Sequence, residues 1–310
     1  MTKNNDEWAV SSMCLGTNVF GWTIDESLSH EILDRYCELG GDFIDTADNY
    51  SVWAEGNPGG VSESVIGNWL AERGRRDEVV IATKLGQMPV FSVYSDEVVR
   101  DSVDASLKRL RVDYVDVVYA HCDYESRPLA EVARAFHELV AEGKARRIGL
   151  SNFRPERVRE WLAVCEAEDL TAPTVLQPHY NLMERQDVET GLAELALAED
   201  LRIVSYAGLA RGFLTGRYRP GHTDGSPRAY QAEAYAGGLG DRVLAELDAI
   251  ASRHDTTLVQ VALAWVLSKP CITSTIASVS RPDQLDDVMG SARLNLDADE
   301  MAALNRASTR

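Results

Sequence analysis

Residues 41–50, GDFIDTADNY, combine an apolar segment with side chains that can transfer protons. The apolar pair Phe43 and Ile44 runs directly into the carboxyl group of Asp45, and the phenol of Tyr50 follows in the same polar loop. A strand that ends in a polar loop often carries catalytic groups, but the same pattern also occurs at an ordinary helix cap. A carboxylate and a phenol could serve acid–base chemistry here if other segments bring charged partners to them.

Polar or cationic side chains also follow most of the other apolar segments. Taken singly, each of them fits a solvated strand end or a structural polar group. If the apolar segments are the parallel strands of one barrel, however, their carboxyl ends meet on one face, where the active sites of such barrels lie. The side chains in question are Asp45, Lys84, His121, Ser151 with Asn152, Gln177, Tyr206, and Ser280 with Arg281.

These side chains belong to an alternation of short apolar segments with segments of helical periodicity. The apolar segments are rich in β-branched residues, as in parallel strands that are covered on both faces. Strands are predicted at 11–16, 42–45, 78–84, 115–121, 146–151, 174–177, 202–207 and 271–277. Helices are predicted at 26–39, 62–73, 95–110, 128–142, 155–168, 187–199, 241–254, 256–268, 282–290 and 297–306. Eight strands, each followed by at least one helix, predict an α/β fold, a single (β/α)8 TIM barrel over residues 1–310.

The interval between the seventh and the eighth predicted strand is unusually long. It contains an extra helix and residues 219–240, which are rich in Gly, Tyr and Ala. We interpret 219–240 as a mobile loop over one face of the barrel, with a plain disordered insertion as the alternative. A doubly wound sheet is the alternative fold, but no GxGxxG follows the first strand, and GNPGG at 56–60 lacks the Gly-Lys-Ser/Thr of a phosphate loop.

Composition restricts the class of protein. The chain has 310 residues and a formal net charge of −18, which argues against a general nucleic-acid or anionic membrane surface. The five cysteines are widely spaced without a CxxC pair, which argues against a disulfide framework or a zinc site. The polar start MTKNNDEWAV has no apolar signal core, and no apolar run reaches the roughly 20 residues that span a bilayer. A cytoplasmic protein is the expectation.

Ordered motifs along the chain resemble those of the aldo-keto reductases. They are DTADNY (45–50), the Lys of IATKLG, the His of DVVYAHCD, GLSNF (149–153), QPHYN (177–181) and GFLTGRY (212–218). The resemblance runs from about residue 12 to residue 290. It implies a (β/α)8 barrel that binds NADP(H) without a Rossmann fold and reduces the carbonyl group of a small molecule to an alcohol.

The resemblance also implies a catalytic tetrad of Asp45, Tyr50, Lys84 and His121. Hydride delivery builds negative charge on the carbonyl oxygen, and Tyr50 would donate the proton. A free tyrosine has a pKa of about 10. An ammonium group at about 4 Å would favour the phenolate by about 4 kcal/mol. Lys84 is therefore predicted to lower the pKa of Tyr50 by up to about three units. Asp45 would hold Lys84 in its charged form, and His121 would orient the carbonyl oxygen. No metal is required.

By the same resemblance, several loops would bind the cofactor. The nicotinamide carboxamide would be held by Ser151, Asn152 and Gln177, and the nicotinamide ring would stack on Tyr206. The backbone of 208–216 would contact the pyrophosphate, Ser280 and Arg281 the 2′-phosphate, and Gln284 and Asp287 the adenosine. The remaining expected cofactor contacts are Gly16, Thr17, Asn18, Asp45, Gly208, Leu209, Arg211, Gly212, Gly216 and Ser278.

The chain departs from the family pattern at three places near the expected cofactor. Tyr206-Ala207-Gly208-Leu209 stands where Tyr-Ser-Pro-Leu is frequent, Ser278 where a glycine is common, and Val288 where many members have Asn. These departures weaken the inference of a strong preference for NADP(H), so NAD(H) stays open.

The expected substrate contacts are aromatic residues in loops, Phe20, Trp22, Trp53 and Tyr124, which equally fit ordinary loop anchors. They suggest aldehydes or α-dicarbonyls and leave sugars and polyketide ketones open. Two other functions are consistent with the same residues. One is a cofactor-sensing regulatory subunit that resembles the potassium-channel β subunits, and the other is an alcohol or sugar dehydrogenase that works in the oxidative direction. The sequence predicts no oligomeric state.

Overall fold

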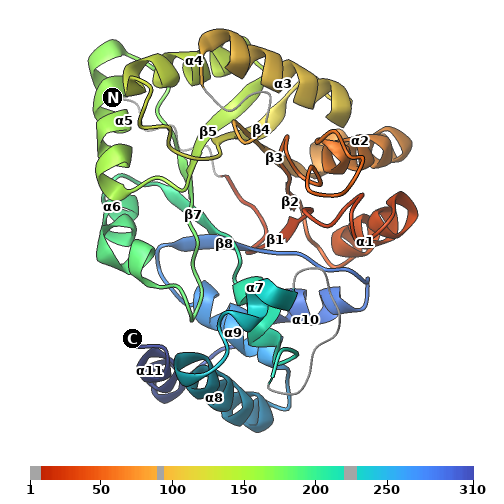
Figure 1. Cartoon of the computed structure of the whole chain (residues 1–310), viewed down its shortest axis with the longest axis vertical. Coiled ribbons are helices and arrows are strands. Elements are labelled where there is room, and N and C mark those ends of the chain that lie inside the picture. Colours follow the sequence, from red (N-terminus) through yellow and green to blue (C-terminus); the bar gives the residue numbers. More distant parts are fainter. Residues whose placement is uncertain (1–7, 89–93, 220–228) are drawn as a thin grey trace.

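The structure is a computed structural model that describes residues 8–88, 94–219 and 229–310. In these ranges, eight parallel strands close into a barrel in which each strand pairs with the next and β8 pairs with β1 (Figure 1). The strands are β1 (Met13–Gly16), β2 (Phe43–Asp45), β3 (Val80–Leu85), β4 (Val115–Ala120), β5 (Ala145–Ser151), β6 (Val175–Gln177), β7 (Arg202–Ser205) and β8 (Ile272–Ala277). The predicted barrel is confirmed, and the doubly wound alternative is excluded because the sheet is closed.

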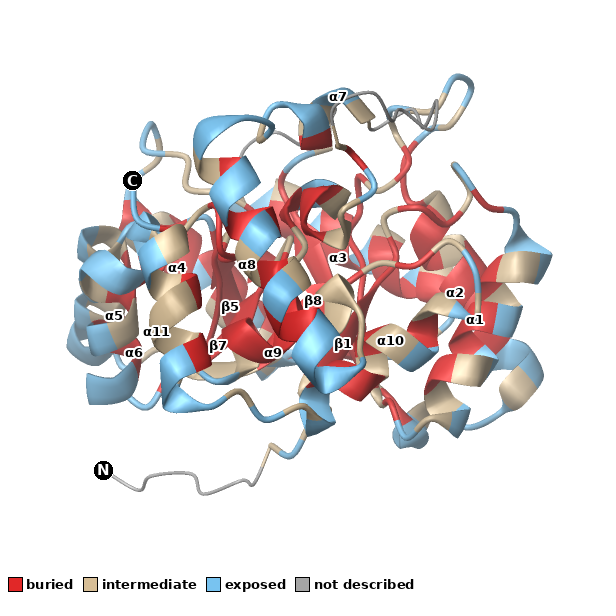
Figure 2. Ribbon diagram, turned by 90° about the horizontal axis from the view of Figure 1, so that it is seen from below, coloured by how far each residue is buried: buried red, intermediate tan, exposed pale blue. Residues whose placement is uncertain are grey.

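Helices surround the barrel with their buried residues towards it and their exposed residues outside (Figure 2). They are α1 (Glu26–Glu38), α2 (Val61–Arg73), α3 (Asp96–Leu110), α4 (Leu129–Ala141), α5 (Pro155–Glu168), α6 (Ala193–Ala198), α7 (Ala229–Glu233), α8 (Gly238–His254), α9 (Leu258–Leu267), α10 (Gln284–Gly290) and α11 (Ala298–Ala307). The predicted helix at 187–199 is interrupted: a π-helical turn, Val188–Leu192, precedes α6, and Gly191 inside it has a φ of 133°. Within the described ranges, no helix is both long and apolar enough to cross a membrane.

The interval between β7 and β8 holds more helix than the sequence predicts. A 3-10 segment, Ala210–Thr215, follows β7, and α7 precedes α8. Of the predicted loop at 219–240, residues 220–228 lie outside the described residues. The rest of that loop contains α7 and the start of α8, which begins at Gly238 rather than at residue 241.

Two apolar clusters fill the fold, one inside the barrel and one between the strands and the helices. Strands covered on both sides explain the continuous apolar segments of the sequence. The inner cluster consists of Cys14, Phe43, Ala82, Val117, Tyr119, Val175, Val204 and Ile276. Because side chains fill the barrel, the polar groups at the carboxyl ends of its strands face a cavity rather than a channel.

Candidate active site

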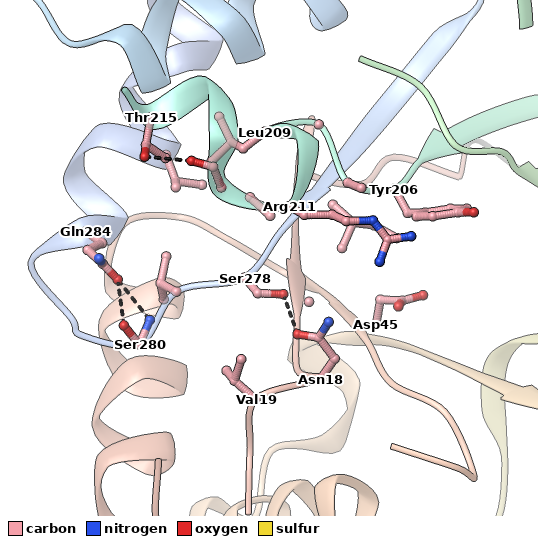
Figure 3. Close-up of a pocket in the computed structure, with 18 of the residues that line it drawn as sticks. Asn18, Val19, Asp45, Tyr206, Leu209, Arg211, Thr215, Ser278, Ser280 and Gln284 are labelled. Atoms are coloured by element: carbon pink, nitrogen blue, oxygen red, sulfur yellow. Dashed lines mark hydrogen bonds between the residues drawn. The ribbon is translucent and has the colours of Figure 1, made fainter. Parts of the chain in front are cut away.

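A cavity of about 830 Å³ lies at the carboxyl ends of the strands. Figure 3 shows side chains of β2, of the loop after β1 and of the segments after β7 and β8 around it. The expected catalytic residues and most of the expected cofactor contacts line this cavity: Gly16, Asn18, Asp45, Tyr50, Lys84, His121, Ser151, Asn152, Gln177, Tyr206, Gly208, Leu209, Arg211, Gly212, Ser278, Ser280, Arg281, Gln284 and Asp287. Closure of the barrel thus brings together side chains that are far apart in the sequence.

Asp45, Lys84 and Tyr50 form a hydrogen-bonded cluster at one end of the cavity. Lys84 Nζ donates to Asp45 Oδ1 at 2.5 Å, to the Thr46 carbonyl at 2.8 Å and to Tyr50 Oη at 2.9 Å. These three bonds use all the protons of the ammonium group. The side chains of Lys84 and Asp45 are each 1% exposed, so each charge depends on the other for compensation.

Burial raises the pKa of Tyr50 to about 12, while the charge of Lys84 acts in the opposite direction and that of Asp45 adds to the increase. The predicted decrease of the Tyr50 pKa is therefore wrong. The sequence identifies both Lys84 and Asp45, but it does not reveal the burial of the phenol, which is the largest cause of the increase. Tyr50 is consequently a protonated phenol throughout the neutral pH range, so its hydroxyl keeps the proton that a proton donor needs.

The two basic side chains next to Tyr50 each have one protonation state near neutral pH. Burial by itself lowers the pKa of Lys84, but the charges and hydrogen bonds of Asp45 and Tyr50 raise it well above its usual value. Burial, together with the charge of Lys84, lowers the pKa of His121 well below its usual value. The ring of His121 lies 6.5 Å from the ring of Tyr50. A charged ammonium and a neutral imidazole therefore flank the phenol.

Two amide side chains hold this cluster from the side of β5 and β6. Gln177 Nε2 donates to Asp45 Oδ2 at 2.8 Å, so both oxygens of the carboxylate have partners. Asn152 Nδ2 donates to the His121 carbonyl at 2.9 Å, and Asn152 Oδ1 accepts from Tyr206 Oη at 2.8 Å. The amides that the sequence assigns to a cofactor carboxamide thus also bind the side chain of Asp45 and the backbone of His121.

Tyr206 presents a ring to the cavity. Its other side is covered by His179, which stacks on it with ring centroids 5.0 Å apart and an angle of 9° between the planes. Ser151, which also lines the cavity, donates from Oγ to the Gln177 carbonyl at 3.0 Å. A supported aromatic ring next to amide groups suits a flat heteroaromatic ligand with a carboxamide.

The end of the cavity away from the catalytic cluster is formed by the loop after β8. Gln284 Oε1 accepts from the N–H groups of Ser280 at 2.8 Å and Arg281 at 3.2 Å, which fixes the loop at the start of α10. The exposed guanidinium of Arg281 is bound by Asp283 through Nε at 3.0 Å and Nη2 at 3.1 Å. Asp287 accepts from Gln260 Nε2 at 3.2 Å. A phosphate at this end would therefore compete with Asp283 for the guanidinium.

Between the two ends, small residues and tight turns bring backbone to the cavity surface. A Cβ atom on Gly16 would lie 2.7 Å from both Ile276 Cγ2 and Ser278 Oγ, so a larger residue does not fit there. Ser278 Oγ donates to Asn18 Oδ1 at 3.0 Å (Figure 3). Gly212 has a φ of 97°, in the left-handed region that glycine adopts without strain.

Two expected cofactor contacts do not line the cavity. Thr17 is fully buried and donates from its N–H and its Oγ1 to the Asp45 carbonyl, at 3.1 and 2.9 Å. Gly216 ends the 3-10 segment after β7 with a φ of 76°. In this structure Thr17 holds the backbone of Asp45, and Gly216 ends the 3-10 segment.

The expected substrate contacts separate into two groups, and none of the four lines the cavity. The ring of Trp53 is exposed and lies 5.6 Å from Trp22 and 6.1 Å from Tyr50. Phe20 is 0% exposed and belongs to the core, so it offers no surface to a substrate. Tyr124 packs on a core tyrosine and donates its hydroxyl to the Gly86 carbonyl.

Other residues line the cavity that the sequence interpretation did not assign. Thr215, Arg217 and Tyr218 lie within the motif GFLTGRY, and the sequence predicts a contact only for the backbone of Thr215. Ala207 and Val288 are positions where the chain departs from the family pattern. No sequence signal indicates the others: Val19, Thr23, Gln87, Val259, Ile276, Ala277, Val279 and Asp283.

The donor set of the cavity fits a nicotinamide dinucleotide. The volume lies within the range of ligand pockets. An aromatic platform and amides lie at the catalytic end, Arg211 points into the cavity from the segment after β7 (Figure 3), and Ser280 and Arg281 lie at the far end. The aromatic ring suits the nicotinamide, and the guanidinium groups suit phosphates.

Comparison with known proteins agrees with this geometry. A family model described as the Aldo/keto reductase family matches residues 12–309. The chain is 32% identical over 292 residues to a probable voltage-gated potassium channel subunit beta of Arabidopsis thaliana, and the alignment covers 90% of this chain and 87% of that protein. It is 30% identical over 326 residues to protein tas of Escherichia coli K12, covering 95% and 93%. It is 31% identical over 291 residues to L-glyceraldehyde 3-phosphate reductase of Escherichia coli O157:H7, covering 89% and 82%.

Proposed function

The chain belongs to the aldo/keto reductase family of oxidoreductases, and from this membership we propose that it reduces the carbonyl groups of aldehydes or ketones with NADPH. One observation carries the proposal. A protonated phenol, Tyr50, lies 2.9 Å from a buried ammonium at the end of a cavity whose other end contains a guanidinium. A proton donor at one end and phosphate-binding groups at the other are what nicotinamide-dependent carbonyl reduction requires.

The residues of the catalytic cluster have distinct roles in this proposal. When bound, the cofactor supplies a hydride to the carbonyl carbon. Tyr50 Oη donates its proton to the carbonyl oxygen as negative charge develops there, and the ammonium of Lys84 stabilises the phenolate that remains. Asp45 keeps Lys84 charged, and neutral His121 orients the carbonyl oxygen by hydrogen bonding. Solvent returns a proton to Tyr50 after the product leaves.

The cofactor contacts proposed here follow from position in the cavity. Tyr206 stacks on the nicotinamide, with the carboxamide held by the neighbouring amides of Asn152 and Gln177. The backbone and side chain of Arg211 contact the pyrophosphate, and Arg281 binds the 2′-phosphate after it leaves Asp283. The exposed ring of Trp53 is proposed to contact the substrate.

The similarity to the probable potassium channel subunit of Arabidopsis thaliana favours a second function, a regulatory subunit that senses NADP(H). Such a protein would bind the cofactor tightly and turn over slowly. The direction of the reaction is a separate matter, because the ratio of oxidised to reduced cofactor in the cell sets it.

The test of the proposed function is NADPH oxidation by the purified protein with a panel of aldehydes and α-dicarbonyls, run beside NADPH titrations. We expect turnover with several members of the panel. Tight NADPH binding without turnover on any of them would contradict the reductase and favour the regulatory subunit.

Replacing Arg281 by alanine is expected to raise the Kd of NADPH about 10- to 100-fold and to change that of NADH little, because only NADPH has the 2′-phosphate that a guanidinium binds by charge-assisted hydrogen bonds. Fluorescence titrations of both cofactors measure this. The matched variant Asp283→Asn removes the carboxylate that competes for Arg281 and should tighten NADPH binding. Equal losses of NADPH and NADH affinity in Arg281→Ala would place the 2′-phosphate elsewhere.

A further inference from the structure

Asp48 is a buried carboxyl group in the loop between Asp45 and Tyr50, and the chemistry described above does not use it. Its side chain is 1% exposed. Its Oδ2 accepts a long hydrogen bond from the Gly86 N–H at 3.3 Å, and its Oδ1 has no hydrogen-bond partner among the described residues. Buried charges normally have full hydrogen-bond compensation. The surroundings of Asp48 therefore suit a neutral acid better than a carboxylate.

The loop that contains Asp48 continues the pairing of β2 with β3. The Thr46 N–H donates to the Ala82 carbonyl at 2.9 Å, and the Asp48 N–H donates to the Lys84 carbonyl at 3.0 Å. The next bond of the ladder is made by the side chain of Asp48, which accepts from Gly86. Asp48 therefore holds the end of β3 in two ways. Its backbone N–H binds Lys84, which carries the catalytic ammonium, and its side chain binds Gly86.

The charge of a second buried carboxyl group, Glu63 of α2, acts on Asp48. Helices α2 and α3 pack side by side here (Figure 1). Glu63 is 0% exposed and is bound by Arg109 of α3, with Nη2 2.6 Å from Oε2, and by Thr83 Oγ1 at 2.5 Å. Because Arg109 is already paired with Glu63, it gives Asp48 little compensation for a negative charge.

These surroundings change the acidity of Asp48. Burial, followed by the charge of Glu63, raises the pKa of Asp48 to about 7, while the Gly86 N–H and Arg109 act in the opposite direction. In the loop after β4, Tyr124 donates its hydroxyl to the carbonyl of Gly86, and it is uncharged at neutral pH because burial raises its pKa.

Tyr50, Lys84 and His121 do not titrate in this range. The pKa of Tyr50 is raised to about 12, that of Lys84 lies above its usual value, and that of His121 lies well below its usual value. A change of activity near neutral pH must therefore come from a group outside these three side chains.

We propose that Asp48 is a positioning residue: its neutral side chain holds the end of β3 against the loop of Asp45 and Tyr50, and its ionisation beside Glu63 releases this contact. The inference rests on the proposed carbonyl reduction. An ionised Asp48 whose Oδ1 has no partner among the described residues gains by moving towards water, and the loop moves with it. A displacement of about 1 Å at a catalytic group is enough to cost about 10²-fold in rate.

The first test compares the wild type with Asp48→Asn, which is neutral at every pH and keeps an oxygen that can accept from Gly86. We measure kcat/KM for carbonyl reduction at saturating NADPH from about pH 5.5 to about pH 9. The wild type should lose activity as the pH rises through about 7, until only the roughly 10²-fold lower activity of the ionised form remains, and Asp48→Asn should stay level. Asp48→Ala should be slow at every pH. A level wild-type profile, or a decrease that persists in Asp48→Asn, overturns the inference.

The control for this test is Asp104→Asn, the same substitution on the outer surface of α3, where the side chain is 51% exposed and pairs with Lys144. Its pH profile should follow that of the wild type. If it became level as well, the change in Asp48→Asn would not be specific to the buried site, which would also overturn the inference.

Hydrogen exchange separates the failure of this inference from the failure of the proposed function. The exchange rate of the Gly86 amide is measured by NMR in the wild type and in Asp48→Asn, at about pH 6 and about pH 8. At a given pH, base catalysis accelerates exchange equally in both proteins, so it cancels in the ratio of their exchange rates. The ratio of the wild-type rate to the variant rate should rise about tenfold from about pH 6 to about pH 8. An unchanged ratio overturns the inference, even for an enzyme that reduces carbonyls. The expected rise in a protein that reduces no carbonyl supports the contact and contradicts the proposed reaction.

Discussion

Replacing Tyr50 by phenylalanine is expected to lower kcat/KM for carbonyl reduction by roughly 10²–10⁴-fold, the usual contribution of a positioned proton donor, and to leave NADPH binding largely intact. The substitution removes the hydroxyl that accepts from Lys84 Nζ at 2.9 Å and keeps the ring. The contacts of that ring with Trp53, at 6.1 Å, and with His121, at 6.5 Å, can therefore persist. Neutral His121 is too weak an acid to replace the phenol.

NADPH oxidation with the best carbonyl of the panel measures this loss, and NADPH fluorescence measures the binding. The matched control is Tyr114→Phe, which deletes a phenolic hydroxyl that donates to Asp77 at 3.0 Å at the surface. Tyr114→Phe should behave like the wild type. Turnover by Tyr50→Phe within a few-fold of the wild type would mean that another group supplies the proton.

The position of the catalytic cluster could be predicted from the sequence because it depends on topology. Asp45 and Lys84 lie in neighbouring strands, and His121 directly follows the next strand. In a closed parallel barrel, residues at the carboxyl ends of strands converge whatever the details of packing. The pattern of eight apolar segments with polar ends is therefore sufficient to predict that these side chains lie at one cavity.

What the sequence could not give depends on burial and on contacts between distant residues. The pKa of Tyr50 was predicted in the wrong direction because the burial of the phenol outweighs the charge of Lys84. The bond from Gln177 to Asp45 joins residues 132 positions apart, and no local pattern reveals it. Phe20 is an aromatic loop residue, as a substrate contact would be, but its side chain packs in the core. The sequence does not show whether the side chain of a loop residue points into the core or into the cavity.

Replacing Lys84 by methionine is expected to have the largest combined effect on activity and stability. Lys84 and Asp45 are both 1% exposed and lie 2.5 Å apart, so the substitution leaves a buried carboxylate without its counter-charge. Removal of one partner of a buried ion pair typically costs about 3–5 kcal/mol, and we expect the free energy of unfolding to fall by about this amount. Carbonyl reduction should fall at least as far as in Tyr50→Phe, because the phenolate that proton donation leaves behind loses its neighbouring cation.

The double variant Lys84→Met/Asp45→Asn separates these two effects. Asparagine at position 45 carries no charge but keeps an oxygen that can accept from Gln177 Nε2, which donates to Asp45 Oδ2 at 2.8 Å in the wild type. Urea unfolding should therefore show that most of the lost stability returns, while carbonyl reduction stays absent. If stability did not return, loss of the long side chain rather than the stranded charge would be responsible. If activity returned with it, the ammonium would serve only to neutralise Asp45, and the stabilisation of the Tyr50 phenolate would have to come from other groups of the cavity.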